Sequence, residues 1–242
     1  MNKPLIRFEI HTHTNYSKDS ILNKYFYLIM LKLKKISVIG ITDHNEIEGA
    51  LNFKKFLKKF NIKVIIGEEI FTTNGEIIGL FLKNRIPPFL TPEETIKRIK
   101  AQEGIVYIPH PYDEKRYKTV LSIKEIAKNK NEIDIIECHN GRNINYFFSE
   151  KQDEIADEFK KLKLVGSDAH TFIELGRNFN IIEPFDTKEE FLKNLKNVKF
   201  QKKDCLKISH QITKLVKIIK LLRSGEIDEL FGVIRNRCKK RK

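Results

Sequence analysis

Short apolar runs alternate along this chain with amphipathic helical patterns, and this alternation restricts the fold more than any other feature of the sequence. The apolar runs are continuous, which is typical of strands in a parallel sheet that helices cover on its faces. The predicted strands span residues 5–10, 37–42, 61–67, 76–82, 104–109, 133–138, 163–170 and 178–185. The predicted helices span residues 21–35, 47–60, 92–103, 121–128, 149–162 and 187–196.

The number of these units indicates a closed architecture. Six or seven strand–helix units favour a β/α barrel over an open sheet, and 242 residues suffice for one such barrel. Residues 21–35 predict a buried helix, and residues 72–75 (TTNG) predict a turn between two strands. Thr91, Pro92 and Glu94 form a helix-capping signature. We therefore expect an α/β barrel.

The last part of the chain differs from the rest in charge. Residues 205–242 contain eleven Lys and Arg against three acids and have helical periodicity, and the whole chain carries a net charge of +14. We predict a barrel domain over residues 1–204 and a basic helical extension over residues 205–242, which packs on the barrel and ends in a disordered KKRK. A basic end favours contact with nucleic acid. Lysine is abundant throughout, so composition alone is the simpler explanation.

Composition also indicates the cellular compartment in which the protein is expected. No run approaches the ~20 apolar residues of a membrane span, and the first residues lack the pattern of a secretory signal. The three cysteines, Cys138, Cys205 and Cys238, are scattered and form no CxxC pair. These features predict a cytoplasmic protein without a membrane contact, a disulfide framework or a structural zinc site.

Six of the seven histidines follow the predicted ends of strands, together with several acids. In a parallel barrel these strand ends open on one face, where active sites are built. A single histidine at such a place is more simply a hydrogen-bonded structural residue, but six equivalent positions indicate a shared site. The residues are His11, His13 and Asp19 after the first strand, Asp43 and His44 after the second, Glu68 and Glu69 after the third, and His110, His139, Asp168 and His170 after later strands.

These residue types point to a metal centre. Imidazole and carboxylate groups without cysteine suit zinc, manganese or iron(II). Residues i and i+2 of a strand point the same way, so His11 and His13 are predicted to bind one ion together. The number of candidate ligands exceeds what one ion needs, and Glu69 is the candidate bridge between two ions. Such centres most commonly hydrolyse phosphoesters; deamination and amide hydrolysis remain alternatives on chemistry alone.

Five motifs in order, HTHTNYSKDS, ITDHNEIEG, GEEI, YIPHP and GSDAH, make residues 5–185 resemble the PHP (polymerase and histidinol phosphatase) family. The resemblance implies a distorted (βα)7-type barrel and a centre of two or three divalent ions, manganese, zinc or iron. It also implies hydrolysis of phosphoester bonds by a metal-bridging hydroxide.

The resemblance further implies roles for individual residues. His11, His13, Glu69 and Asp168 are expected to bind one ion, Glu69 and His110 a second, and Asp19, His44 and His170 a third. Asp43 is expected to orient these ligands or to join them. Two positions depart from the family pattern: Lys18 separates Ser17 from Asp19, and Glu76 stands where a histidine is usual. Glu76 is therefore either a ligand or merely a turn acid.

Other residues are predicted to act on the substrate. Arg116 and Arg142 lie on loops of the same face, where either can clamp a phosphate. A metal-bound water or a site histidine such as His170 is expected to protonate the leaving alcohol, and His139 is predicted to line the pocket or to support a ligand from behind. The expected substrates are nucleotides (nucleoside bisphosphates) or short oligonucleotides. Histidinol phosphate is the alternative substrate, and a non-catalytic nucleic-acid-binding module is the alternative of another class.

Overall fold

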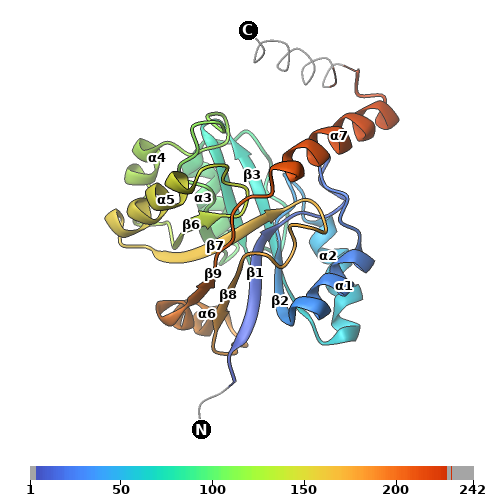
Figure 1. Cartoon of the computed structure of the whole chain (residues 1–242). Coiled ribbons are helices and arrows are strands. Elements are labelled where there is room, and N and C mark those ends of the chain that lie inside the picture. The colour runs from blue at the N-terminus through green and yellow to red at the C-terminus, as the bar shows by residue number, and fades with distance from the viewer. Residues whose placement is uncertain (1–3, 228–229, 231–242) are drawn as a thin grey trace.

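Seven strands form a closed barrel in the computed structural model, which describes residues 4–227 and 230 (Figure 1). Neighbouring strands pair in the order β2-β3-β4-β5-β6-β7-β1, and β1 pairs again with β2, which closes the ring. The predicted (βα)7-type barrel is thus confirmed. The barrel strands are β1 (Ile6–Thr12), β2 (Ile36–Ile41), β3 (Lys63–Thr72), β4 (Gly75–Leu80), β5 (Ile105–Ile108), β6 (Ile135–Asn140) and β7 (Leu162–Ala169).

The expectation of a purely parallel sheet is wrong at β4, which runs antiparallel to both β3 and β5. The predicted turn over residues 72–75 is the cause, because only two residues separate the strands and so short a connection joins antiparallel strands. Gly75 has a φ of 93°, and a Cβ there would lie 2.5 Å from the Leu121 nitrogen. The reversal places the beginning of β4 at the end of the barrel where β3 finishes.

The barrel interior is apolar along most of its length. Inward side chains pack in one cluster that includes Phe8, Ile65 and Leu164. At the lower end, Phe191 of α6 (Lys188–Asn194) packs against Phe8 with ring centroids 5.6 Å apart. Strands β8 (Phe179–Ile182) and β9 (Lys199–Gln201) extend the sheet antiparallel beside β1. The Phe191 side chain fills the barrel end beside α6, which leaves the opposite end, where β1 and most other strands finish, as the place for a site; we call this opposite end the mouth.

Helices cover the outside of the barrel on two sides (Figure 1). On one side lie α1 (Lys24–Lys34) and α2 (Glu48–Leu57), followed by the 3-10 turn η1 (Lys58–Phe60). On the other lie α3 (Pro92–Ala101), α4 (Ile123–Lys128) and α5 (Tyr146–Glu158), while the 3-10 turn η2 (Leu195–Asn197) follows α6. The predicted cap of α3 is present, since the Thr91 side chain accepts a hydrogen bond from the Glu94 amide.

Two helix predictions need correction. The helix over residues 21–35 is not buried, because only Tyr27 and Leu31 of α1 are fully buried. Its other apolar residues give it two apolar faces, and one helix can bury only one face against the barrel. Helix α5 begins at Tyr146, three residues before its predicted start at residue 149, because Asn145 caps it through the Phe147 amide.

Helix α7 (Lys207–Ser224) lies beside the mouth, at the end of the barrel toward which β1 runs (Figure 1). It belongs to the predicted basic extension, whose definition as a separate unit stays a prediction. The terminal KKRK and Ile234, a residue of the helical periodicity in this extension, lie outside the described residues. Within the described part of the chain, no helix is both long and apolar enough to cross a membrane.

Candidate metal centre

Unusual backbone conformations aim the ligand candidates into the mouth. Ile10 and His11 are consecutive, yet Ile10 packs in the barrel interior while His11 also turns inward. A φ of 64° at His11 allows this departure from strict alternation. His110 and Asp168 also have positive φ values, 29° and 52°. Such conformations cost about 1–3 kcal/mol each and persist where the surrounding structure imposes them, often at functional sites.

Glu69 stands at the centre of the cluster. Its Oε1 lies 3.1 Å from both the His11 Nε2 and the His110 Nε2. Its Oε2 lies 3.0 Å from the His44 Nδ1 and 3.3 Å from the His13 Nε2. One buried carboxylate therefore faces four imidazoles from three different strand ends, which is the arrangement expected of a bridging ligand.

Asp168 forms the second shared carboxylate. Its Oδ1 lies 3.4 Å from the His13 Nε2, 3.7 Å from the His11 Nε2 and 3.4 Å from the His170 Nδ1. Its Oδ2 accepts a hydrogen bond of 2.6 Å from the Arg116 Nη1. Asp168 thus joins the buried part of the cluster to a cation.

The outer part of the cluster opens to solvent. Asp19 lies 3.3 Å from the His170 Nε2 and 3.8 Å from the His44 Nε2. The side chains of Asp19 and His44 are 27% and 24% exposed, whereas His11 and His13 are fully buried. We call Asp19, His44 and His170 the outer triad. A substrate can reach the cluster from this side.

Glu76 belongs to the cluster and is not a turn acid. Because β4 is reversed, Glu76 lies at the mouth, with its carboxylate 3.3 Å from the His110 Nε2 and 3.7 Å from the His44 Nδ1. It is buried together with Glu69. The departure from the usual histidine therefore places a carboxylate among the candidate ligands of the cluster.

The donor set fits divalent metal ions. Four overlapping groups of three residues each place one ligand atom per residue within 4.8 Å of the others. Several of these atoms are buried and make no hydrogen bond, including the Nε2 atoms of His11 and His13, Glu69 Oε2, Glu76 Oε1 and Asp19 Oδ1. Leaving so many polar atoms of one cluster unbonded would be costly unless an ion satisfies them.

The charge balance also favours cations. Burial and the neighbouring His170 and His44 lower the pKa of His13 to about 3, so its imidazole is neutral and able to ligate at pH 7. Burial opposes protonation of His44, but Glu69 raises its pKa to about 10. Burial likewise opposes ionisation of Asp168, but Arg116 and the imidazoles hold its pKa well below the usual value. The carboxylates thus attract positive charge, either protons or metal ions.

Glu137 is a functional residue that the sequence reasoning missed. It is fully buried, and its carboxylate accepts hydrogen bonds from His11 Nδ1 (2.9 Å), Tyr107 (2.6 Å), the His110 amide (2.6 Å) and Asn140 (2.9 Å). The bond to His11 fixes the ring with Nε2 toward Glu69, as carboxylates behind metal-bound histidines commonly do. The available signal was an acid near the end of the predicted strand IDIIEC, a run that also contains Asp134.

Asp43 lies behind the cluster and not in it. Its Oδ1 accepts hydrogen bonds from the Thr14 amide (2.7 Å) and Ser17 (2.6 Å), and its Oδ2 from the Thr14 hydroxyl (2.6 Å). Burial raises the pKa of Asp43, while these bonds oppose the rise. Asp43 thus holds the loop after β1 through Thr14 and Ser17, and its expected role in orienting the ligands stays a prediction.

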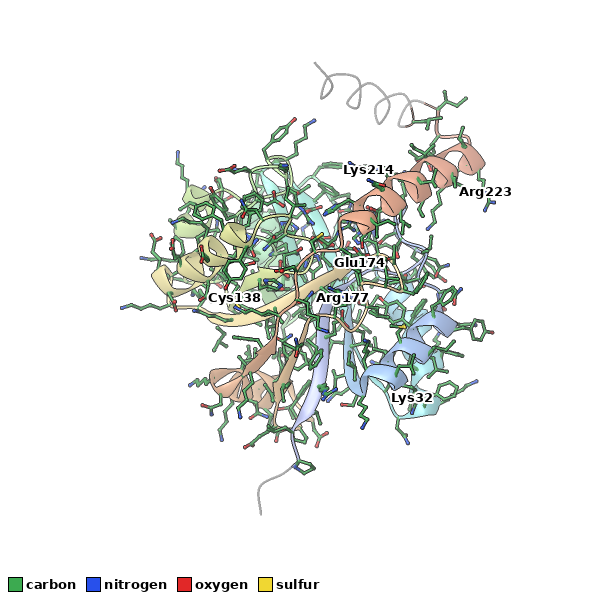
Figure 2. All side chains as sticks on the ribbon, in the orientation of Figure 1. Lys32, Cys138, Glu174, Arg177, Lys214 and Arg223 are labelled. Carbon is green, nitrogen blue, oxygen red and sulfur yellow. The ribbon has the colours of Figure 1, made fainter. Side chains whose placement is uncertain are left out.

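The two predicted arginines have different surroundings. Arg116 contacts Asp168 and is 22% exposed, so it reaches both the cluster and solvent. Arg142 is buried and donates to Thr213 of α7 at 2.8 Å. Its Nε lies 3.7 Å from Glu174, beneath the start of α7 (Figure 2). Arg116 thus lies at the solvent-facing edge of the cluster, while Arg142 contacts the extension.

Two further histidines have different surroundings. His139 points away from the cluster, because the register of β6 shifts between Glu137 and His139. Its ring pairs with Ser149 at 2.8 Å and the Lys203 carbonyl at 3.3 Å, so it does not line the mouth. His170 donates from Nδ1 to the Asp168 carbonyl (2.8 Å), which directs Nε2 toward Asp19. The predicted roles of His170, as a ligand and as a proton donor, stay predictions.

Comparison with known proteins identifies the relationship. The PHP domain family matches residues 9–178, well over half of the chain. The chain belongs to the PHP domain family. Two uncharacterized proteins of Methanocaldococcus jannaschii are similar to it. MJ1587 is 46% identical over 117 residues, covering 44% of this chain and 68% of its own. MJ0417 is 34% identical over 203 residues, covering 79% of each.

Solved structures share the fold of this PHP domain at low sequence identity. PsfC from Pseudomonas syringae has a TM-score of 0.63 at 16% identity, covering 91% of this chain and 98% of its own. A protein from Bifidobacterium adolescentis, provisionally named a metal-dependent phosphoesterase, has a TM-score of 0.57 at 15% identity, covering 67% and 87%. An amidohydrolase from Chromobacterium violaceum with bound sulfate and no metal has a TM-score of 0.56 at 14% identity, covering 68% and 87%.

The contact between α7 and the PHP barrel should depend on pH through His210. Its Nε2 pairs with the Arg142 carbonyl (3.1 Å) and its Nδ1 with the Arg142 guanidinium (3.3 Å), which requires a neutral ring. Burial, Arg142 and Arg116 lower the pKa of His210 to about 4. The stabilisation is therefore complete above pH ~6.5 and is lost as pH falls toward 4.

Hydrogen–deuterium exchange of α7 tests this expectation. Protection of Lys207–Ser224 should fall between pH 6.5 and 4, after correction for intrinsic exchange, more steeply than protection of the barrel strands. A His210→Gln variant should lack the additional slope. Equal slopes in both proteins would show that His210 does not control the contact.

Proposed function

We propose that this PHP domain is a metal-dependent phosphoesterase that acts on nucleotides or short oligonucleotides. The observation that carries the proposal is the convergence of five histidines and three further carboxylates around Glu69, with Arg116 bonded to Asp168 at the edge. Nitrogen and oxygen ligands without cysteine, beside an arginine, suit hydrolysis of an anionic ester.

The residues would bind ions in overlapping sets. His11, His13, Asp168 and Glu69 would hold one ion, Glu69 with His110 a second, and the outer triad a third; Glu76 would add a carboxylate beside His44 and His110. When bound, manganese, zinc or iron ions would supply an activated water nucleophile and neutralise charge on the phosphoryl oxygens. Glu137 would keep His11 oriented throughout, since its four accepted hydrogen bonds hold the ring in place.

Arg116 is the group that favours a phosphoester over a neutral substrate. Its guanidinium is always charged, and Asp168 holds Nη1 at 2.6 Å near the cluster. Phosphoryl oxygens that approach the outer triad would meet this cation, which can stabilise the charge of the transition state.

The positively charged surroundings favour a nucleotide or oligonucleotide over a smaller phosphate ester. The extension in residues 205–242 has a balance of eleven basic to three acidic residues, and its helix α7 lies beside the mouth. Cationic groups near the mouth attract substrates that carry more than one phosphate. A nucleoside 3′,5′-bisphosphate has this charge, whereas histidinol phosphate also carries a positive amine.

A substrate panel tests the proposal. Protein stripped of metal and refilled with manganese, zinc or iron(II) should hydrolyse at least one of a set of nucleoside monophosphates, 3′,5′-bisphosphates, short RNA and DNA, and histidinol phosphate. His11→Ala should abolish turnover, and His139→Ala, which removes a buried histidine outside the cluster, should retain it.

The alternatives give different results in the same panel. Preference for histidinol phosphate would replace the nucleotide assignment. An absence of turnover with every metal, together with salt-sensitive nucleic-acid binding that survives chelation, would contradict the enzyme and indicate a binding module.

A further inference from the structure

Helix α7 contributes a residue to the architecture of the metal centre. We propose that Lys220 is a positioning residue that holds the loop bearing Asp19, so that the C-terminal helix completes the outer triad. This inference rests on the proposed function, because it assigns Lys220 a task in the metal centre proposed there. It concerns a residue far outside the matched family region, residues 9–178.

The ammonium of Lys220 binds three carbonyl oxygens of one loop. Its Nζ donates to the carbonyls of Asn15 at 2.9 Å, Ser17 at 2.7 Å and Ser20 at 2.7 Å. An ammonium has three N–H donors, so all of them are used on this loop. Asp19 lies between two of the bound positions, Ser17 and Ser20. The loop is therefore tied to α7 on both sides of the ligand candidate.

The electrostatic surroundings of Lys220 are consistent with a position close to the metal centre. Lys220 is half-buried, and burial lowers its pKa, while Asp19 and Asp43 act in the opposite direction. Both carboxylates therefore lie close enough for their field to act on the ammonium. Lys220 remains a cation that screens the carboxylates of this loop as well as binding its backbone.

Small movements of this loop would matter. The carboxylate of Asp19 lies 3.3 Å from the His170 Nε2, and metal–ligand distances tolerate only about 0.2 Å. The inner side of the loop is already fixed, since the Ser20 hydroxyl donates to the carbonyls of His13 (3.2 Å) and His170 (3.0 Å). Lys220 fixes the outer side, where Lys18 lengthens the loop relative to the usual Ser-Asp pattern.

Helix α7 is itself anchored at two places, so it can serve as a rigid support. Near its beginning Thr213 accepts a hydrogen bond from Arg142 at 2.8 Å. Near its end Leu221 is buried, and Glu226 pairs with Lys18 beyond the helix. The helix thus connects the loop after β6 with the loop after β1, and Lys220 acts from a defined position.

Lys220→Met tests the proposal, because it removes the donors and keeps most of the side-chain stem. Lys214→Met is the matched control: Lys214 is exposed on the same helix, and its replacement changes the net charge equally (Figure 2). Calorimetric titration of metal-free protein with Mn²⁺ should show that Lys220→Met weakens the weakest class of sites by about 10–100-fold. The tighter sites and all sites of Lys214→Met should be unchanged.

A second variant separates positioning from general destabilisation. Lys220→Arg keeps the charge and several donors, so it should recover part of the lost affinity. Equal affinities of Lys220→Met and wild-type protein at all sites would overturn the proposal, as would uniform loss at every site. The titration does not depend on turnover: wild-type protein that binds Mn²⁺ in classes but hydrolyses no phosphoester would contradict the proposed function alone.

Discussion

Glu69→Gln should lower turnover by on the order of 10³-fold or more, because metal ions contribute several kcal/mol and each ~1.4 kcal/mol is a factor of ten. Glu69 faces four imidazoles with two oxygens. A glutamine keeps the shape but offers one ligand oxygen and no charge, so it cannot bridge ions. Steady-state rates with the best substrate of the panel, at saturating Mn²⁺, measure the effect.

The neighbouring residue provides a close control for this variant. Glu68 is equally buried, but it faces away from the cluster and accepts a hydrogen bond from the Ile86 amide at 2.8 Å. Glu68→Gln should therefore keep turnover within a few-fold of wild type. Similar losses in both variants would mean that the fold, and not the bridge, is affected.

Replacing Glu137 should damage both activity and stability. Glu137→Ala leaves four buried donors without their acceptor, which should reduce the free energy of unfolding by about 3–5 kcal/mol. Glu137→Gln should cost less stability but still lower metal affinity or turnover about 10–100-fold. The reason is that all four groups donate, whereas the amide of glutamine offers one acceptor oxygen and turns an NH₂ toward two donors.

Urea denaturation at pH 7, with and without Mn²⁺, measures the stability part of this prediction. Tyr107→Phe is the matched control, because it removes only one of the four hydrogen bonds and should cost about 1 kcal/mol. A Glu137→Gln variant with normal stability, metal affinity and turnover would show that the orientation of His11 does not need this carboxylate.

The sequence predicted the barrel and most of the cluster because both follow from local patterns. Continuous apolar runs marked the strands, and the position just after each run marked the mouth. His13, Glu69, His110 and Asp168 meet there, as this reasoning requires. These predictions needed no long-range information beyond the common direction of the strands.

The parts of the site that the sequence did not predict depend on the direction in which side chains and strands point. Hydrophobic periodicity does not give this direction. Glu137 and His139 should share a face by simple alternation, but a register shift in β6 separates them. The expected function of Glu137 also depends on its hydrogen bond to His11, which lies 126 positions away in the sequence. The reversal of β4, by contrast, had a local signal, since the turn predicted over residues 72–75 is of the kind that joins antiparallel strands.

The contacts of α7 with the mouth could not be predicted from the sequence for another reason. Lys220 binds backbone carbonyls, and any residue type can present a carbonyl, so no pattern marks the contact. The periodicity of residues 205–242 predicted a helix. It could not predict where along the mouth that helix would lie.

The most direct test of the central claim is the anomalous scattering of a crystal grown with Mn²⁺. The account predicts at least two peaks at the mouth, one among His11, His13 and Asp168 and one beside His110, with Glu69 between them. Absence of any peak within ligand distance of Glu69, in crystals that diffract well and contain millimolar Mn²⁺, would contradict the metal centre and with it the proposed phosphoesterase.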